Sequence, residues 1–395
     1  MVSEEDLMDM HASLNLGAVS YESYVDPGRF EIDKEKIFKK VWLNVGRVEE
    51  IPSPGYIVRR MDEWDTSIII NRNKNGKLSA FHNICTHRGN ELVWSSEGTN
   101  TTYVCKFHGW AFKDSGGLIG VPESRMFPDL DKKKCGLKPV AVDVWNGFVF
   151  VHFDPNPSEG LREYLGEVAD RLDAYPFEDF SLGYRYELPL NSTWRILRDS
   201  QLEGYHAKQL HKNSLPDFLK NPENNNIHVV EAGRLGRHGV VGLIGNKLAK
   251  PTATQAILAG KASFVAGRDT AFKNRNKALN PTKADNWSFD LYFVFPNFHV
   301  IVMDDMYLTH VMRANGPDNC TWEAVAAFPP ATNGEEAFHR EYAKCSIRDT
   351  WLEDGSTIER TYYGLKSGVL QEVHLQAQEF LIAHAEAECE RMSAA

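Results

Sequence analysis

Two short motifs that pair a cysteine with a histidine constrain the fold of this chain more than any other feature. Cys85 and His87 form the first motif. Cys105 and His108 form the second, after a spacer of seventeen residues. Two thiolates and two imidazoles suit either a tetrahedral zinc ion or a two-iron cluster in which two histidines replace two cysteines on one iron. Because each cysteine is followed closely by its own histidine, we expect two short loops that hold a cluster from both sides, which favours iron–sulfur over zinc.

A second constellation lies in the stretch 191–211. At about 3.6 residues per turn, Asp199, Glu203 and His206 fall on one helical face. His211 lies five residues beyond His206, about 140° away around a helix, so the helix must end or distort for both imidazoles to converge. Two imidazoles and one carboxylate on one side of a metal are the ligand set of non-haem ferrous oxygenases. An ordinary helix with Glu203 and His206 as a surface pair is the alternative for this stretch taken alone.

The carboxylate of this iron site is not determined by spacing. Three acidic residues near the C-terminal end, Glu353, Asp354 and Glu359, remain candidates. An acidic residue in a helix is more often a solvated side chain than a ligand.

Strand-like segments around the two Cys-His motifs predict a first domain. Short runs rich in β-branched and aromatic residues, bounded by Gly, Pro, Asn and Asp, cover residues 58–61, 66–71, 78–82, 140–144 and 147–153. The sequence D-P-N-P at residues 154–157 has the composition of a linker. We therefore expect an all-β domain over residues 41–155, preceded by an N-terminal arm over residues 1–40 that packs on the larger domain. Gly89 and Gly109 follow the two motifs, where we expect backbone N–H groups to approach cluster sulfur.

Residues 156–395 predict a second domain of the α+β class. Runs rich in Tyr, Phe, Val and Thr predict consecutive antiparallel strands at residues 287–295, 298–303, 307–313 and 321–328. Helices are expected at 159–175, 334–366 and 370–391, so the sheet carries helices on one side. The less regular region 214–285, with a helix at 253–266, is expected to form a lid or pocket wall that sets substrate specificity.

Composition excludes several function classes. A formal net charge of −10 disfavours nucleic-acid binding, which relies on clustered Lys and Arg. The six cysteines are too few and too scattered for a disulfide scaffold. The chain opens M-V-S-E-E-D-L-M-D-M and has no apolar stretch long enough to span a bilayer, so we expect a cytoplasmic protein that does not bind membranes.

The motifs resemble those of one known family. C-x-H-R-G followed by C-x-x-H-G-W is similar to the Rieske [2Fe–2S] signature. N-x-x-W, then D-x-x-x-E-x-Y-H-x-x-x-x-H, resembles the mononuclear iron motif of Rieske non-haem iron oxygenases (the aromatic-ring-hydroxylating dioxygenase family), alpha subunit type. Both occur once, in the family's order and about a hundred residues apart. The resemblance covers nearly the whole chain and implies a Rieske domain followed by a catalytic domain with a helix-grip antiparallel sheet.

The resemblance also implies the ligands of both centres. It assigns the [2Fe–2S] cluster to Cys85, His87, Cys105 and His108, and a mononuclear Fe(II) to His206, His211 and Asp354. Asp354 is selected because the segment 351–368 resembles the family's final helix, in which an aspartate precedes a glutamate by five residues and a G-L-x-S element follows.

Glu203 has a separate role in this resemblance. The family places a carboxylate three residues before the first iron histidine, where it connects a cluster histidine of one subunit to an iron histidine of the next. The implied electron path runs from His108 of one subunit through Glu203 to His206 of its neighbour, which predicts a cyclic trimer. Asp199 would orient this network. Many ring-hydroxylating members have aspartate in place of Glu203, and glutamate also occurs in members that act on non-aromatic or quaternary-ammonium substrates.

The implied function is that of an oxygenase component. Electrons from NAD(P)H would arrive through a separate reductase or ferredoxin, and O₂ would be activated at the iron to hydroxylate an organic, aromatic substrate. Ring-hydroxylating dioxygenases are usually paired with a beta subunit, whereas monooxygenases and demethylases are built from alpha chains alone, so the motifs leave the beta subunit open. A monooxygenase or demethylase for a non-aromatic or quaternary-ammonium substrate is the first alternative. A Rieske electron carrier, which needs only residues 41–155, and a zinc-binding scaffold are alternatives of other classes.

Overall fold

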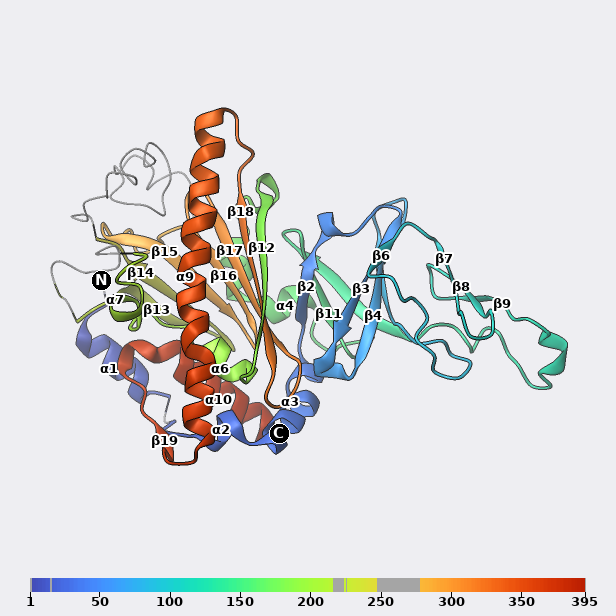
Figure 1. The fold of residues 1–395 in the computed structure, drawn as a ribbon, viewed down its shortest axis with the longest axis horizontal. Helices are drawn as coiled ribbons and strands as arrows, with labels where there is room; N and C mark the ends of the chain where they lie inside the picture. The colour runs from blue at the N-terminus through green and yellow to red at the C-terminus, as the bar shows by residue number, and fades with distance from the viewer. Residues whose placement is uncertain (1, 15, 216–223, 225, 247–277, 395) are drawn as a thin grey trace. The chain divides into compact units, whose positions relative to one another are not determined.

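The computed structural model describes residues 2–14, 16–215, 224, 226–246 and 278–394 of the 395-residue chain. The chain divides into two compact units: unit 1 comprises Met1–Asp33 with Leu165–Ala395, and unit 2 comprises Lys34–Tyr164. Figure 1 shows the elements of both units. The predicted α+β class is confirmed. The helix predicted at 253–266 lies outside the described residues.

Unit 2 is built from two antiparallel sheets. The larger has the order β2-β11-β10-β5-β4-β3-β6 and the smaller the order β7-β8-β9. Their bounds are β2 Leu43–Arg47, β3 Gly55–Met61, β4 Thr66–Arg72, β5 Leu78–His82, β6 Glu97–Gly98, β7 Thr102–Val104, β8 Ala111–Lys113, β9 Leu118–Gly120, β10 Pro139–Trp145 and β11 Phe148–His152. The Cys85 loop follows β5, and the Cys105 loop connects β7 to β8.

Unit 1 contains an antiparallel sheet of seven strands in the order β12-β18-β17-β16-β15-β14-β13. The bounds are β12 Ser181–Leu190, β13 Val229–Leu235, β14 His238–Ile244, β15 Trp287–Val294, β16 Phe298–Val302, β17 Tyr307–Ala314 and β18 Cys320–Phe328. Each of the four strands predicted between residues 287 and 328 is present. No sequence pattern predicted β13 and β14, which complete the other edge of the sheet.

The strand register places one row of side chains on the same face of this sheet. Leu291 of β15 pairs with Ile301 of β16, and Ile301 pairs with Leu308 of β17. Because side chains alternate between faces, Phe289 and His310 join these three on the same face. This face is the wall on which the candidate site is built.

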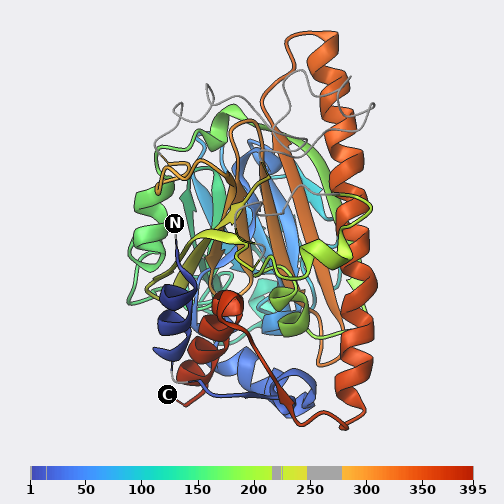
Figure 2. The same ribbon diagram turned by 90° about the vertical axis from the view of Figure 1, so that its left-hand side faces the viewer.

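The helices of the chain have the bounds α1 Glu4–Ala12, α2 Glu22–Val25, α3 Pro27–Lys36, α4 Leu161–Leu165, α5 Glu167–Leu172, α6 Trp194–Asp199, α7 Ala207–Leu210, α9 Gly334–Lys366 and α10 Phe380–Ala394. Of these, α6, α9 and α10 contact strands of the seven-stranded sheet of unit 1. The long helix α9 has the predicted bounds, and Figures 1 and 2 show it lying along the sheet. Its N-cap is Asn333, whose side chain accepts a hydrogen bond from the backbone N–H of Glu336. Its buried residues recur every three or four positions, which is the spacing of a single helical face.

Two predicted helices differ from the structure. Residues 370–379 are not part of the last helix, because β19 Glu372–Val373 pairs with β1 Val19–Ser20 in a two-stranded sheet and α10 begins only at Phe380. The segment 159–175 contains two short helices in place of one. Extended pairing between distant segments overrides the local helical pattern in the first case.

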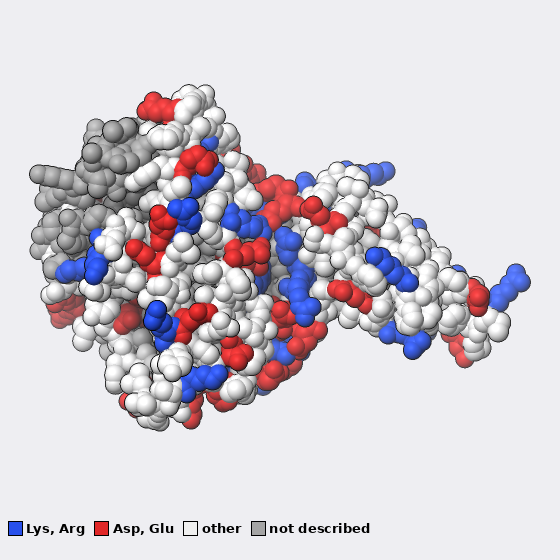
Figure 3. Space-filling model, viewed as in Figure 1, with Lys and Arg blue, Asp and Glu red and all other residues white. Residues whose placement is uncertain are grey.

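Two surface properties agree with the composition. Figure 3 shows acidic and basic side chains interspersed over much of the visible face. None of the helices described has both the length and the apolar character needed to cross a membrane.

Candidate metal centres and substrate cavity

The two Cys-His loops of unit 2 share one backbone arrangement. The N–H of Gly89 donates to the carbonyl of Cys85 at 3.0 Å, and the N–H of Gly109 donates to that of Cys105 at 2.9 Å. Both glycines have positive φ, +77° and +72°, a region that costs residues with a Cβ about 1–2 kcal/mol. A Cβ at Gly89 would meet no atom within 4 Å. Glycine is therefore favoured there by its backbone conformation, and the expected approach of the backbone N–H groups to cluster sulfur stays a prediction.

The predicted cluster ligands form a thiol pair and an imidazole pair. Cys85 and Cys105 are buried, and burial, with a smaller contribution from the Cys105 thiol, raises the pKa of Cys85 to about 11. The rings of His87 and His108 lie 4.7 Å apart, and His87 stacks on Trp110 at 4.8 Å. Nδ1 of His87 is buried without a hydrogen-bond partner among the described residues. The arrangement of the two thiols as one pair and the two imidazoles as another fits a cluster with two thiolates on one iron and two imidazoles on the other.

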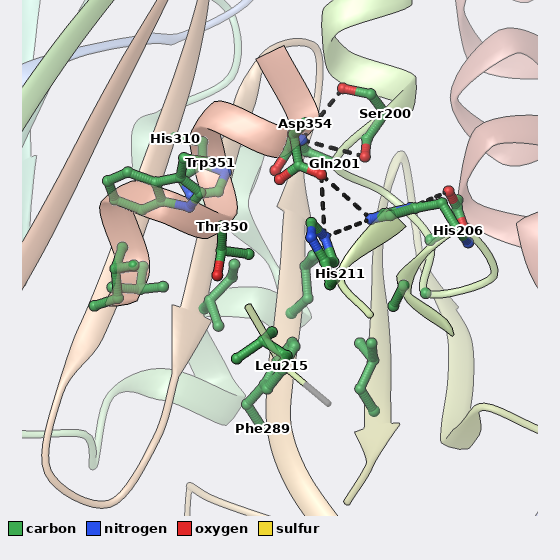
Figure 4. Close-up of a pocket in the computed structure, with 18 of the residues that line it drawn as sticks. Ser200, Gln201, His206, His211, Leu215, Phe289, His310, Thr350, Trp351 and Asp354 are labelled. Carbon is green, nitrogen blue, oxygen red and sulfur yellow. Dashed lines mark hydrogen bonds and ion pairs between the residues drawn. The ribbon is translucent and has the colours of Figure 1, made fainter. Parts of the chain in front are cut away.

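His206, His211 and Asp354 converge in unit 1, as Figure 4 shows. One ligand atom from each lies within 4.8 Å of the others. The two imidazole Nε2 atoms are 3.2 Å apart. Oδ1 of Asp354 lies 3.5 Å from Nε2 of His206 and 3.1 Å from Nε2 of His211. Two imidazole nitrogens and one carboxylate oxygen in this arrangement could bind a ferrous ion from one side and leave its other coordination positions open.

A break in the helix brings the two imidazoles together. Helix α6 ends at Asp199, and the chain leaves the helical path before α7 begins at Ala207. His206 and His211 flank the four residues of α7 at its two ends. The distortion that the spacing required is therefore present, and Asp199 does not share a continuous helical face with Glu203.

The Nδ1 atom of each of these two imidazoles contacts a carboxylate. Nδ1 of His206 contacts Glu203, which also accepts the backbone N–H of His206 at 3.1 Å. Nδ1 of His211 lies 2.9 Å from Glu353, which also accepts the hydroxyl of Ser214 at 2.6 Å. A carboxylate at Nδ1 favours the tautomer with its proton there and leaves Nε2 free for a metal.

The structure places the three acidic candidates for the iron ligand in three different environments. Asp354 is 4% exposed and points toward the histidines. Glu353 binds the far side of His211. Glu359 accepts the backbone and side-chain N–H groups of Asn191 at 2.7 and 3.0 Å. The apolar period of α9 is a signal that could have selected Asp354, because Asp354 shares the buried face with Ile347, Trp351 and Ile358. No sequence signal indicated the contact between Glu353 and His211.

The charges around the imidazoles favour a cation. Burial disfavours the imidazolium form of His206, but the hydrogen bond and charge of Glu203 and the charge of Asp354 outweigh it and raise the pKa of His206 to about 9. Burial also opposes protonation of His211, and Asp354 and Glu353 again raise its pKa. Carboxylates that stabilise a proton at these nitrogens also stabilise a divalent ion, which competes with protons for the same atoms.

Asp199 lies in a buried network of charged groups. Its carboxylate accepts the hydroxyl of Tyr24 and Nε of Arg198, both at 2.7 Å. Arg198 also pairs with Glu386 of α10. These contacts attach the end of α6 to α2 and α10. The predicted role of Asp199 in orienting Glu203 stays a prediction.

A cavity lies beside the three converging residues. It contains about 710 Å³ of empty space, part of it open to solvent. Apolar side chains from the sheet and from α9 form much of its wall, among them Leu243, Phe289, Leu291, Ile301, Leu308 and Ile347. His310, Thr350 and Trp351 border it as well, and Figure 4 shows them on one side of the converging residues. A mainly apolar cavity with a few polar groups is the usual form of a small-molecule site.

Two family models match the chain. Residues 177–395 match the ring hydroxylating alpha subunit (catalytic domain). Residues 41–132 match the Rieske [2Fe-2S] domain. The two matches fall on the segments that contain the candidate iron residues and the Cys-His loops, respectively.

Named relatives and solved structures are also similar. A chloroplastic choline monooxygenase of Spinacia oleracea is 33% identical over 195 residues, which are 48% of this chain and 44% of the relative. A glycine betaine monooxygenase oxygenase subunit of Pseudomonas aeruginosa is 30% identical over 197 residues, 50% of this chain and 44% of the relative. The chain thus spans about half the length of the curated relatives it matches. A quaternary ammonium Rieske monooxygenase, CntA, has the same fold, with a TM-score of 0.74, 20% identity, and coverage of 97% of this chain and 98% of that one.

Proposed function

Because the chain belongs to the ring hydroxylating alpha subunit family and carries a Rieske [2Fe-2S] domain, we propose that it is the oxygenase component of a monooxygenase for a quaternary ammonium compound. Its cofactors are a [2Fe-2S] cluster and a mononuclear iron. We assign the cluster to Cys85, His87, Cys105 and His108, and the iron to His206, His211 and Asp354.

The convergence of His206, His211 and Asp354 beside an apolar cavity is the observation that carries this proposal. Ferrous iron in such a donor set, supplied with electrons by the cluster, would provide the oxygen chemistry. The chain's own residues hold the geometry. Glu203 and Glu353 orient the two imidazoles, and the apolar walls bind the substrate and limit the access of water.

The substrate class follows the relatives more closely than the expected aromatic compound. The two named relatives act, by name, on choline and glycine betaine, which are quaternary ammonium compounds. A trimethylammonium group has apolar methyls around a positive charge, and it is bound by aromatic faces and apolar walls near carboxylates. Phe289, Trp351 and Glu203 border the cavity and supply these features. The glutamate at position 203 agrees with this alternative.

We also propose the cyclic trimer and the separate electron donor. In this assembly Glu203 would connect His108 of a neighbouring subunit to His206 through hydrogen bonds, and electrons would pass between the two metal centres along this connection. Glu203 borders a second hollow next to His206, together with Tyr205, which is 57% exposed. An exposed aromatic residue beside a buried carboxylate is consistent with a surface that another subunit covers. A catalytically competent monomer in analytical ultracentrifugation would contradict the trimer.

Oxygen uptake tests the function directly. The purified holoprotein, a reductase and NAD(P)H are supplied with choline, glycine betaine, carnitine, and a set of aromatic acids and hydrocarbons. We expect uptake that depends on reductant and on an ammonium substrate, with an oxidised product in stoichiometric amount. Uptake with aromatic compounds alone would contradict the proposed substrate class. Cluster reduction without uptake on any substrate would favour the electron-carrier alternative.

A further inference from the structure

Two histidines in the sheet of unit 1 have imidazole nitrogens without partners. His299 of β16 and His310 of β17 are opposite each other on adjacent strands and are 0% and 1% exposed. Among the described residues, neither nitrogen of either ring has a hydrogen-bond partner. Buried polar atoms in native proteins are nearly always paired, so each exception indicates an absent water, ion or ligand, or a functional role.

His310 borders the cavity next to the candidate iron residues. The indole rings of Trp322 and Trp351 pack edge-on against its imidazole, each at 5.2 Å between ring centroids. The two contacts lie at interplanar angles of 74° and 84° and restrict rotation of the ring. A buried, rigidly held and unpaired polar ring in a mainly apolar wall is a place where a ligand's polar atom would be stabilised.

The charge state of His310 limits the ligand group it would bind. Burial lowers the pKa of His310 to about 3, so the ring is neutral at physiological pH. A neutral imidazole offers one N–H donor and one acceptor nitrogen. A hydroxyl can use either of these, since it both donates and accepts a hydrogen bond.

A substrate carboxylate is less well matched to this cavity. The described residues that line it include no Lys or Arg. A carboxylate only accepts hydrogen bonds, so it can pair with the N–H of the neutral imidazole but not with the acceptor nitrogen. The imidazole of His310 is therefore matched better by a neutral hydroxyl.

We propose that His310 is a specificity-determining residue that hydrogen-bonds the hydroxyl group of the substrate, so that a hydroxylated trimethylammonium cation is preferred over one with a carboxylate or with no polar group. The inference rests on the proposed function, because it concerns the polar end of the same substrate. This hydrogen bond gives the buried imidazole of His310 a partner and fixes the orientation of the substrate in the cavity.

The test compares three probes on the assembled holoenzyme with its reductase. Choline carries the hydroxyl, propyltrimethylammonium replaces it with a methyl group, and glycine betaine carries a carboxylate. We expect kcat/KM and the calorimetric affinity for choline to exceed those for propyltrimethylammonium by about tenfold or more, which is the typical value of one hydrogen bond to a buried group. Glycine betaine is expected to bind more weakly than choline.

Three variants connect this preference to the imidazole. His310→Leu should bring choline and propyltrimethylammonium to within about twofold of each other, because the hydrogen bond is lost. His310→Gln keeps a neutral donor and acceptor and should retain most of the preference. Leu308→Val is the matched control, since Leu308 borders the same cavity on the same strand; it should change both affinities by the same factor.

The outcomes separate this inference from the proposed function. Equal affinities for choline and propyltrimethylammonium in the wild type would overturn the role of His310, even if ammonium-dependent oxygen uptake is observed. An unchanged preference in His310→Leu would overturn it as well. Absence of uptake with every ammonium compound would overturn the proposed function and the inference together. The wild-type comparison requires no variant, so the test does not depend on the folding of His310→Leu.

Discussion

The two candidate metal centres are built in opposite ways. The loops after Cys85 and Cys105 are each closed by a hydrogen bond to a glycine four residues later. At the iron centre, by contrast, 142 residues separate Glu353 from the His211 that it binds. The predicted cluster ligand His108 is exposed, whereas the predicted iron ligands His211 and Asp354 are buried, each at 4% exposure.

This difference follows from what each centre must do. A centre that exchanges electrons with another protein needs an exposed edge, and local loops can provide one. A centre that binds O₂ and a substrate needs an enclosed cavity, which only several packed elements can form. The iron centre therefore depends on tertiary packing to a degree that the cluster loops do not.

The largest expected effect comes from removing a predicted ligand of the [2Fe–2S] cluster. Cys105→Ala removes a cluster thiolate, so we expect loss of the visible iron–sulfur absorption and of essentially all turnover. Absorption spectra and iron and sulfide analysis measure this result. Cys345→Ala is the matched control, because Cys345 is exposed and lies outside the motifs; it should leave both properties unchanged. A Cys105→Ala protein with a wild-type spectrum would remove the cluster assignment.

A substitution at the candidate iron centre should separate oxygen uptake from the visible absorption of the cluster. His206→Ala is expected to abolish oxygen uptake and lower the iron content by the mononuclear ion, while the cluster's visible absorption stays intact. Metal analysis and spectroscopy on one sample measure both. His374→Ala, an exposed histidine elsewhere in unit 1, serves as the control. Turnover of His206→Ala at the wild-type rate would show that the iron lies elsewhere.

A smaller effect is expected from the carboxylate behind His211. Glu353→Gln keeps the shape of the side chain but weakens its hold on Nδ1, and changes of this kind typically cost about 10–100-fold in metal affinity. Competition with a chelator measures the affinity for the mononuclear ion. Glu359→Gln is the matched control on the same helix, because Glu359 binds Asn191. Equal losses in the two variants would mean that Glu353 does not position His211.

The smallest effect on the two metal centres is expected from a buried carboxylate that lies away from both. Burial raises the pKa of Asp290 to about 7, although the backbone N–H of Asn280 and the indole N–H of Trp287 both donate to it. Its ordinary value is about 3.9, so the folded protein binds an extra proton between about pH 4 and 7. Stability from this group is present at low pH and is lost as pH rises through 7, by up to about 4 kcal/mol.

Asp290→Asn tests this dependence. The variant should show a flatter dependence of unfolding free energy on pH between 4 and 7 than the wild type, as measured by denaturant titration. Since Asp290 contacts neither centre's predicted ligands, the iron content and the cluster spectrum should stay the same. Parallel pH profiles for the two proteins would contradict the raised pKa.

The sequence by itself determined the parts that depend on neighbours along the chain. The Cys-His loops, the paired histidines of the iron site and the bounds of α9 were all predicted, because ligand spacing, backbone geometry and helical period act over a few residues. The resemblance then selected Asp354 among three carboxylates. The segment 370–379 was predicted wrongly, because its pairing partner lies near the other end of the chain.

Only the tertiary structure decided which distant side chains meet. Packing of α9 over the end of α7 brought Glu353 to His211, and the buried charges around Arg198 drew Asp199 to Tyr24. Strand register placed His310 in the cavity wall without a partner among the described residues. Such contacts depend on the angles and distances at which whole elements pack against one another, and the pattern of residues within one element does not encode these.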